Sequence, residues 1–318
     1  MKILRIVLTG EEPPFYTITE AFTKAFDEVD TLYWDEINTQ DLNGIIQARI
    51  RAIKYDLVFM QIQHPDIISI ETARVLSENS LVFNWTGDVR NEIVWYEQIA
   101  PYVVTLFTNM NDVEKIRSIG CRAEYLQIGY DHKYYFNTET TRFSNIVFCG
   151  NYYQDSCFPL TQERVEAVKT LKIFPEFKLY GRQWEKLEIH SEGFADNKTE
   201  ALVYNRSLLA LNISHYNYSR YFSDRLLREM ACGCCVISHR FKDCEFIENK
   251  EIVFYDDMQD LVKKAFYYFS NPQEAIEIGK AAAKKVESDF KWDNFTTNLK
   301  TLINKYGTNA NAVSGIAI

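Results

Sequence analysis

Short apolar runs alternate with amphipathic segments along most of the chain, and this alternation restricts the fold more than any other feature. In the first half, apolar runs at 2–9, 56–61, 81–85 and 103–108 are each followed by a segment with the 3.6-residue period of a helix. Strands that are apolar throughout are buried on both faces, as in parallel sheets covered by helices. The pattern therefore predicts an α/β fold built from βαβ units.

The alternation restarts after a polar stretch at 132–144, with apolar runs at 145–149, 177–180 and 208–213. A chain of 318 residues is long enough for two domains of ~100–200 residues each. The sequence therefore predicts two doubly wound domains in succession. Their expected bounds are 1–142 for the first, 143–289 for the second, and 290–318 for a final helix with a frayed tail.

The negative charge is concentrated in the first domain. Residues 1–142 hold 13 Lys and Arg against 21 Asp and Glu, a balance of −8, whereas residues 143–318 hold 22 against 23, a balance of −1. Proteins that grip nucleic acid or anionic membranes normally show the opposite bias, so both partners are disfavoured.

The composition also bears on location and metals. No run of ~18 apolar residues occurs, which predicts no transmembrane segment. The seven cysteines lack the spacing of a disulfide framework or a zinc site, so we expect free thiols in a reducing cytoplasm and no bound metal.

The motifs of several large enzyme classes are missing. The chain has no G-x-x-x-x-G-K-[ST] loop, no G-x-G-x-x-G, no G-x-S-x-G elbow and no H-E-x-x-H. These absences disfavour phosphotransferases of the P-loop type, dinucleotide-dependent dehydrogenases and common hydrolases. A transferase that works without a metal becomes more attractive.

The stretch 212–238 is the most informative part of the sequence. A strand ends near Ser214, a polar and aromatic loop follows, and Ser223 or Asp224 caps a helix that stops at Gly233. The free N–H groups and the dipole at a helix start suit a diphosphate, and Arg225 in the first turn would add a charge-assisted bond. The alternative is an ordinary capped helix whose Arg225 pairs with a surface carboxylate.

Several short stretches, in this order, resemble GT-B glycosyltransferases, and most closely the spore-maturation-protein type of bacteria and phages. The stretches are Asn84–Arg90, Phe148–Tyr152, Tyr180–Trp184, Ser223–Gly233 and the final helix with Phe290, Trp292 and Phe295. The resemblance implies two Rossmann-like domains facing a cleft, an acceptor-side N-terminal one and a donor-binding C-terminal one. It also implies a final crossover helix that returns to the first domain.

The resemblance assigns a donor site to the second domain. Ser223, Asp224 and Arg225 would hold the diphosphate, while Ser214 and His215 would contact phosphate or sugar. The remaining assignments are Gly150 and Asn151 at a close-approach turn, Tyr180, Gly181 and Trp184 around the base, and Glu229 on the ribose hydroxyls. The alternatives are an ordinary βα turn, a core aromatic pair, and a solvated carboxylate. The sequence departs from the retaining pattern, because Arg220 and Arg228 stand where that pattern has glutamates.

Candidates on the acceptor side follow the strands of the first domain. Asp88, in a loop with Arg90, is the candidate general base for an acceptor hydroxyl. His64 is the rival base, and the alternatives are ordinary turn chemistry for Asp88 and a loop histidine for His64. Gly10 would mark a close approach near the acceptor.

The resulting hypothesis is a cytoplasmic, metal-independent and cofactor-free glycosyltransferase. It would move a sugar, most simply a hexose, from a nucleotide-diphosphate donor such as a UDP-sugar to an acceptor hydroxyl. The acceptor would be a glycan, a protein or a small molecule, with nucleic acid disfavoured by the acidic first half. Two rival hypotheses are a non-catalytic protein that binds sugar or nucleotide, and a nucleotide-sugar epimerase of the same fold.

Overall fold

A computed structural model describes residues 1–9, 16–154 and 157–313, and the chain divides into two compact units. Unit 1 combines residues 1–128 with 292–318, and unit 2 is the continuous stretch 129–291. The sequence placed its boundaries after residues 142 and 289, so the main difference is the segment 129–142. Gly10, expected near the acceptor, lies outside the described residues.

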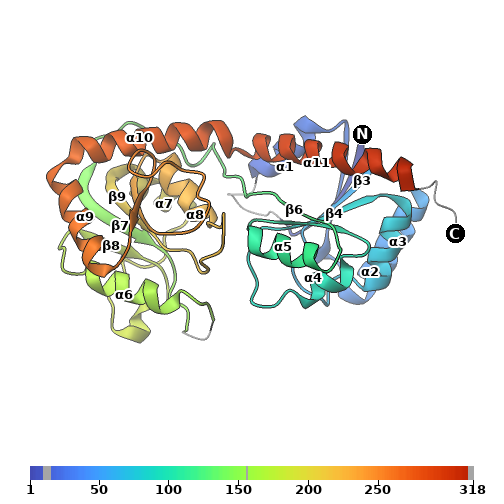
Figure 1. Cartoon of the computed structure of the whole chain (residues 1–318), viewed down its shortest axis with the longest axis horizontal. Helices are drawn as coiled ribbons and strands as arrows, with labels where there is room; N and C mark the ends of the chain where they lie inside the picture. The colour runs from blue at the N-terminus through green and yellow to red at the C-terminus, as the bar shows by residue number, and fades with distance from the viewer. Residues whose placement is uncertain (10–15, 155–156, 314–318) are drawn as a thin grey trace. The chain divides into compact units, whose positions relative to one another are not determined.

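Unit 1 is built on a six-stranded parallel sheet with the strand order β2-β1-β3-β4-β5-β6. Helices cover both faces of this sheet (Figure 1). The strands are β1 (Lys2–Val7), β2 (Glu28–Tyr33), β3 (Leu57–Met60), β4 (Leu81–Thr86), β5 (Val104–Phe107) and β6 (Ala123–Tyr125). The helices are α1 (Tyr16–Ala25), η1 (Trp34–Glu36), α2 (Thr39–Ala52), α3 (Ile70–Asn79), α4 (Val94–Ile99), α5 (Met110–Ser118) and α11 (Trp292–Val313).

The two faces of this sheet form separate cores. Along β1, Leu4 and Ile6 belong to the core that includes residues of α2 and α3, whereas Ile3 and Val7 belong to the core shared with α1 and α11. This is the period-2 alternation of a strand that is buried on both sides. The near-continuous apolar sequence of β1 is therefore explained by helices on both faces.

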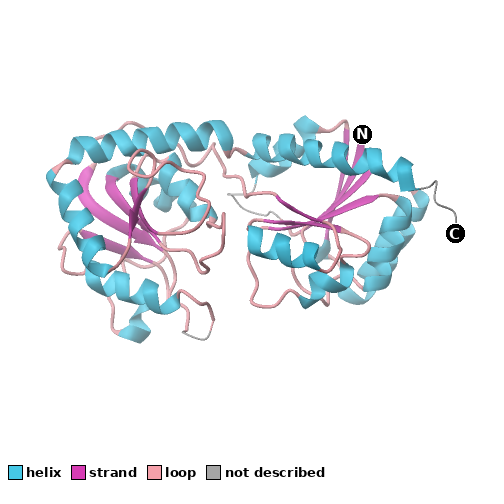
Figure 2. Ribbon diagram, in the orientation of Figure 1, coloured by secondary structure: helices cyan, strands magenta, loops and turns pink. Residues whose placement is uncertain are grey.

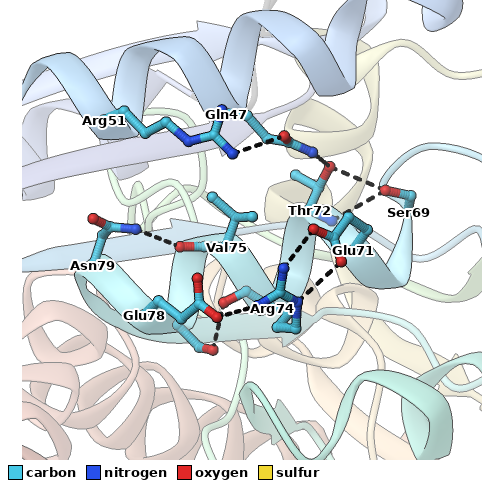
Figure 3. A network of polar contacts seen from close by, with 10 residues as sticks. Gln47, Arg51, Ser69, Glu71, Thr72, Arg74, Val75, Glu78 and Asn79 are labelled. Carbon is cyan, nitrogen blue, oxygen red and sulfur yellow. Dashed lines mark hydrogen bonds and ion pairs between the residues drawn. The ribbon is translucent and has the colours of Figure 1, made fainter.

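Helices α2 and α3 are joined by a polar network as well as by apolar packing (Figure 3). Gln47 of α2 donates from Nε2 to Oγ1 of Thr72 on α3 at 2.9 Å. Ser69 caps α3 by accepting the Thr72 N–H at 3.1 Å, which satisfies one of the free donors at the helix start. On the exposed side of α3, Arg74 pairs with Glu71 and Glu78.

Unit 2 carries a five-stranded parallel sheet in the order β11-β10-β9-β7-β8. Helices lie around this sheet (Figure 2). The strands are β7 (Phe143–Cys149), β8 (Phe177–Tyr180), β9 (Ser207–Asn212), β10 (Cys235–His239) and β11 (Val253–Tyr255). The helices are α6 (Thr161–Leu171), η2 (Trp184–Leu187), α7 (Asn197–Arg206), α8 (Asp224–Ala231), α9 (Met258–Ser270) and α10 (Pro272–Asp289).

The segment 129–142 joins unit 2 through hydrogen bonds to α7 and its surroundings. The Arg142 guanidinium donates to the carbonyl oxygens of Tyr204 at 3.0 Å and Ser207 at 2.8 Å. The Tyr135 hydroxyl donates to Oε2 of Glu200 at 2.7 Å. These side chains bind the segment to unit 2, although its polar composition reads as a linker. No helix within the described ranges is long and apolar enough to cross a membrane.

Candidate functional site

A pocket of about 230 Å³ lies where strands β7, β8 and β9 of unit 2 end. In doubly wound sheets this carboxyl edge is the usual place for a ligand. The pocket is walled by the turns that follow these strands and by the first turns of α7 and α8. Its lining comprises Cys149, Gly150, Asn151, Tyr153, Arg164, Tyr180, Gly181, Phe194, Ala195, Asn197, Glu200, His215, Asp224, Arg225 and Arg228.

The turns after β7 and β8 form one side of the pocket and are locked together by their backbones. Gly150 donates its N–H to the carbonyl of Tyr180 at 2.8 Å, and Asn151 Oδ1 accepts the N–H of Arg182 at 2.8 Å. Gly181 has a φ of +141°, and a Cβ added there would lie 2.1 Å from the Gly150 carbonyl oxygen. Only glycine fits at this position.

Two arginines give the pocket an excess of positive charge. Arg164 Nη2 and Arg225 Nη1 donate to the same carbonyl oxygen, that of Ile213, at 2.7 and 3.4 Å. No carboxylate in the described part of the chain forms an ion pair with either guanidinium. Burial, followed by the nearby Arg225 charge, lowers the pKa of Arg164 well below its ordinary range. Two such uncompensated cations favour an anionic ligand.

Helix α8 begins at this pocket and adds its dipole to the two arginines. Ser223 occupies the N-cap with extended backbone angles, but its hydroxyl makes no capping hydrogen bond. The N–H groups of the first turn are therefore not bonded by the cap side chain. A helix start of this kind, with Arg225 in its first turn, stabilises negative charge.

The opposite wall is acidic and is organised around Arg228. This guanidinium pairs with Asp224 on its own helix and with Glu200 of α7, the latter at 3.2 Å. Glu200 also accepts from the hydroxyls of Tyr135 at 2.7 Å and Tyr204 at 3.1 Å. Arg228 is thus neutralised inside the protein, unlike Arg164 and Arg225.

His215 lines the pocket as a neutral imidazole. Its ring stacks on Phe158 at a centroid distance of 4.0 Å, and its Nε2 lies 3.5 Å from Arg164 Nη1. Burial lowers the pKa of His215 to about 2, and the charges of Arg164 and Arg225 act in the same direction. His215 can therefore hydrogen-bond a phosphate or sugar oxygen but carries no charge near pH 7.

The structure separates the predicted donor residues into two groups. The first group lines the pocket and comprises Gly150, Asn151, Tyr180, Gly181, His215, Asp224 and Arg225. The second group is not among the lining residues and comprises Trp184, Ser214, Ser223 and Glu229.

Trp184 and Glu229 are the clearest members of the second group. Trp184 is fully buried against Phe148 and Tyr152, and its indole N–H donates to the Gly150 carbonyl at 2.7 Å. It supports the turn from below, as the core aromatic alternative expected. Glu229 is 0 % exposed, and neither carboxyl oxygen has a hydrogen-bond partner in the described structure, so it is not the solvated carboxylate of the alternative interpretation.

Sequence reasoning missed several residues of the site. Arg164 sits inside α6, where an arginine in an amphipathic helix gives no sign that it points inward. Glu200 and Asn197 lie in the first turn of α7, which begins at Asn197, whereas the apolar period of the sequence predicts a helix only over residues 201–207. A capping signal was present, because Asp196 accepts the Thr199 N–H at 2.8 Å.

In unit 1, the predicted acceptor residues also follow strand ends. Asp88 comes two residues after β4, with its side chain 71 % exposed and 3.8 Å from Arg90. His64 lies four residues after β3 and is exposed. The two loops are tied together by Asn84, whose amide both accepts from and donates to the backbone of Ile62 at 3.0 Å.

The described residues contain no group of three or more His, Cys, Asp or Glu side chains arranged to hold a metal ion. All seven cysteines are free, including the crowded Cys232, Cys234 and Cys235, which are buried. Burial raises the pKa of these three thiols. They act as small apolar side chains in the core.

The chain was compared with protein families and with known proteins. Residues 161–301 match the family described as glycosyl transferase-like. No curated protein matches the chain by sequence.

Solved structures similar in fold include a sucrose-phosphate synthase from Thermosynechococcus elongatus (TM-score 0.67, 13 % identity, covering 97 % of this chain and 100 % of that one). HepE of Anabaena, solved with UDP and glucose, is similar at a TM-score of 0.66 and 11 % identity, covering 96 % of this chain and all of its own. A glycosyltransferase from Rickettsia africae ESF-5 is similar at 0.67 and 12 %, covering 96 % and 98 %.

The solved structures confirm the predicted α/β, GT-B fold, and the family match supports the predicted class of glycosyltransferase. The final helix belongs to unit 1, as predicted for a helix that returns to the first domain. These matches do not address the resemblance to the spore-maturation-protein type, which stays a prediction.

Proposed function

We propose that this chain, whose glycosyl transferase-like domain and GT-B fold identify a glycosyltransferase, transfers a hexose from a UDP-sugar to an acceptor hydroxyl without a metal ion. The observation that carries the proposal is the pair of uncompensated arginines beside the start of α8. Arg164 and Arg225 supply two positive charges for the two negative charges of a donor diphosphate. As the sugar leaves, the same groups stabilise the charge that develops on the departing diphosphate.

A neighbouring pocket supports the placement of the nucleotide base. It has a volume of about 540 Å³ and shares Gly181 and Phe194 with the diphosphate pocket. The guanidinium of Arg182 lies over the Phe194 ring at 4.3 Å, which offers a flat surface on which a base can stack. We place the uracil here, with Tyr180 and Gly181 between base and diphosphate. HepE and the pneumococcal O-GlcNAc transferase GtfA, both solved with UDP, favour uridine as the nucleoside.

The acceptor and the compartment are assigned from other features. Asp88 is our candidate general base, because a carboxylate that is largely exposed at a strand end can reach an acceptor hydroxyl. His64, after the neighbouring strand, is the alternative. The seven free cysteines support a reducing cytoplasm as the place of reaction.

The donor proposal is tested by calorimetric titration with UDP and GDP and by UDP release from UDP-glucose and UDP-N-acetylglucosamine. We expect UDP to bind and Arg225→Ala to weaken it at least tenfold, since a charge-assisted bond contributes roughly 1.5–3 kcal/mol. Arg240→Ala is the matched control, because this arginine pairs with Glu248 and Asp256 away from the pocket. Equal UDP affinity in both variants would contradict the assignment, and loss of turnover in EDTA would contradict metal independence.

The base is identified by comparing Asp88→Asn with His64→Gln. The variant of the true base loses most of its turnover, on the order of a hundredfold, while its affinity for UDP is unchanged. Full turnover in both variants would remove both residues from the reaction.

A further inference from the structure

The acidic wall of the diphosphate pocket has no role in binding phosphate. Of the described residues that line this pocket, Asp224 and Glu200 are the acidic ones. A carboxylate accepts hydrogen bonds and repels a phosphate, so neither side chain can hold the diphosphate. Glu229, which the sequence assigned to ribose hydroxyls, is not among the lining residues and has no exposed surface.

The two pocket carboxylates differ in how many hydrogen bonds they already accept from the protein. Glu200 already accepts from Tyr135, Tyr204 and Arg228, and its side chain is 11 % exposed. Asp224 uses only Oδ2, for Arg228, and its side chain is 38 % exposed. Its Oδ1 therefore remains available to a ligand, as far as the described residues show.

The surroundings of Asp224 fix its direction. Arg228, one turn further along α8, holds Asp224 Oδ2 and is itself held by Glu200, which two tyrosine hydroxyls orient. These charge-assisted bonds connect the buried tyrosines, through Glu200 and Arg228, to the half-exposed carboxylate of Asp224. Such an arrangement suits recognition of a neutral group that donates hydrogen bonds.

We propose that Asp224 accepts a hydrogen bond from a hydroxyl group of the nucleotide-sugar donor, and that Arg228 and Glu200 position it. The inference rests on the proposed function, since it assumes that the diphosphate occupies the arginine wall. It differs from the sequence prediction, which gave Asp224 to the diphosphate and the hydroxyls to Glu229. The hydroxyl belongs either to the ribose or to the sugar that is transferred.

Titration calorimetry with four ligands separates these two sources. The ligands are UDP, 2′-deoxy-UDP, 3′-deoxy-UDP and UDP-glucose. If Asp224 contacts the ribose, the wild-type chain prefers UDP over one deoxy analogue by about tenfold to a hundredfold, the range for a hydrogen bond to a charged group. If it contacts the sugar, the deoxy analogues bind like UDP, and UDP-glucose binds more tightly than UDP.

In Asp224→Ala we expect the affinities that differ in the wild-type chain, either UDP against a deoxy analogue or UDP-glucose against UDP, to come within about twofold of each other. Asp260→Ala is the matched control, because Asp260 forms the same (i, i+4) pair with Lys264 at the start of α9, outside the pocket. Asp224→Asn keeps the size of the side chain and serves if the alanine variant does not fold. Unchanged ligand preferences in variants that still bind UDP overturn this inference alone. A wild-type chain that binds none of the four ligands overturns the proposed function, and this inference with it.

The positioning role has its own readout. Arg228→Lys keeps the charge but cannot bridge Asp224 and Glu200 with a planar fork. We expect it to weaken the hydroxyl preference in the wild-type background and to have no further effect on that preference in Asp224→Ala. A merely structural Arg228 would lower stability and leave the preference intact, which would refute its positioning role.

Discussion

At the scale of single residues, Glu229 is the most exceptional group in unit 2. Its carboxyl is fully buried, and among the described residues neither oxygen has a hydrogen-bond partner. Burial raises its pKa well above the ordinary range, while the charge of Arg225 acts in the opposite direction. Burial without a hydrogen-bond partner therefore favours the uncharged, protonated form of this carboxyl in the folded chain, which argues against a role as ribose ligand or as counter-ion of Arg225.

This state predicts how stability depends on pH. Above pH ~4.3 the unfolded chain releases the proton of Glu229 while the folded chain keeps it, so the free energy of unfolding falls as pH rises toward the folded-state pKa. Glu229→Gln removes this fall, which amounts to at most about 1.4 kcal/mol per pH unit. In urea unfolding between pH 4 and 8, the free energy of unfolding of the variant should rise relative to that of the wild type as pH increases. The exposed Glu277→Gln is the control, and a variant that loses ground at pH 8 would contradict an uncharged Glu229.

At the scale of elements, the turn after β8 decides the shape of the donor pocket. Gly181 and Gly193 both have positive φ values, +141° and +93°. They differ in surroundings, because a Cβ at Gly181 meets the Gly150 backbone, whereas one at Gly193 has nothing within 4 Å. The pair therefore separates backbone strain from steric exclusion.

We expect Gly181→Ala to destabilise the chain by more than the ~1–3 kcal/mol that positive φ costs a residue with a Cβ, and also to weaken UDP binding. Gly193→Ala should show only the smaller loss of stability that comes from its positive φ, because nothing lies within 4 Å of its added Cβ. Urea unfolding and UDP titration of both variants measure the difference. Equal losses of stability in the two variants would mean that the turn at Gly150 shifts to accommodate the added Cβ without a further cost.

The sequence predicted most elements because their periodicity is local. The apolar period predicts helices over residues 70–78, 111–119 and 272–288, and the structure has them at 70–79, 110–118 and 272–289. The sequence also predicts a helix from Asp224, where α8 begins. The site was predicted less completely, because burial is decided by tertiary packing. Nothing near Arg164 in sequence signals that its guanidinium meets Arg225, and Glu229 is turned about 100° from Arg228 around α8 and does not line the pocket.

At the scale of the whole molecule, unit 1 depends on a helix from the far end of the chain. The ring of Phe295 in α11 packs against three rings of unit 1. Its centroid lies 5.1 Å from that of Trp85, 6.1 Å from that of Phe59 and 6.4 Å from that of Phe22. Phe295→Ala should therefore cost unit 1 about 3–5 kcal/mol, as other buried aromatic truncations do. UDP affinity should stay unchanged, because the donor pocket lies in the continuous unit 2.

Denaturant unfolding and UDP titration of the same preparation test this expectation. Phe143→Ala is the control, since that ring is 62 % exposed and its loss should change stability by no more than ~0.5 kcal/mol. A stability loss no larger than that of the control would mean that α11 does not complete the core of unit 1.

The discontinuity of unit 1 also has a consequence for biosynthesis. Residues 129–291 contain every strand and helix of unit 2, so that unit can close as soon as they have emerged from the ribosome. The sheet of unit 1, which is made first, lacks the contacts of Trp85 and Phe59 with Phe295 until α11 has been translated. The core of unit 1 can therefore be completed only after every element of unit 2 has been synthesised, although its first strands are made earliest.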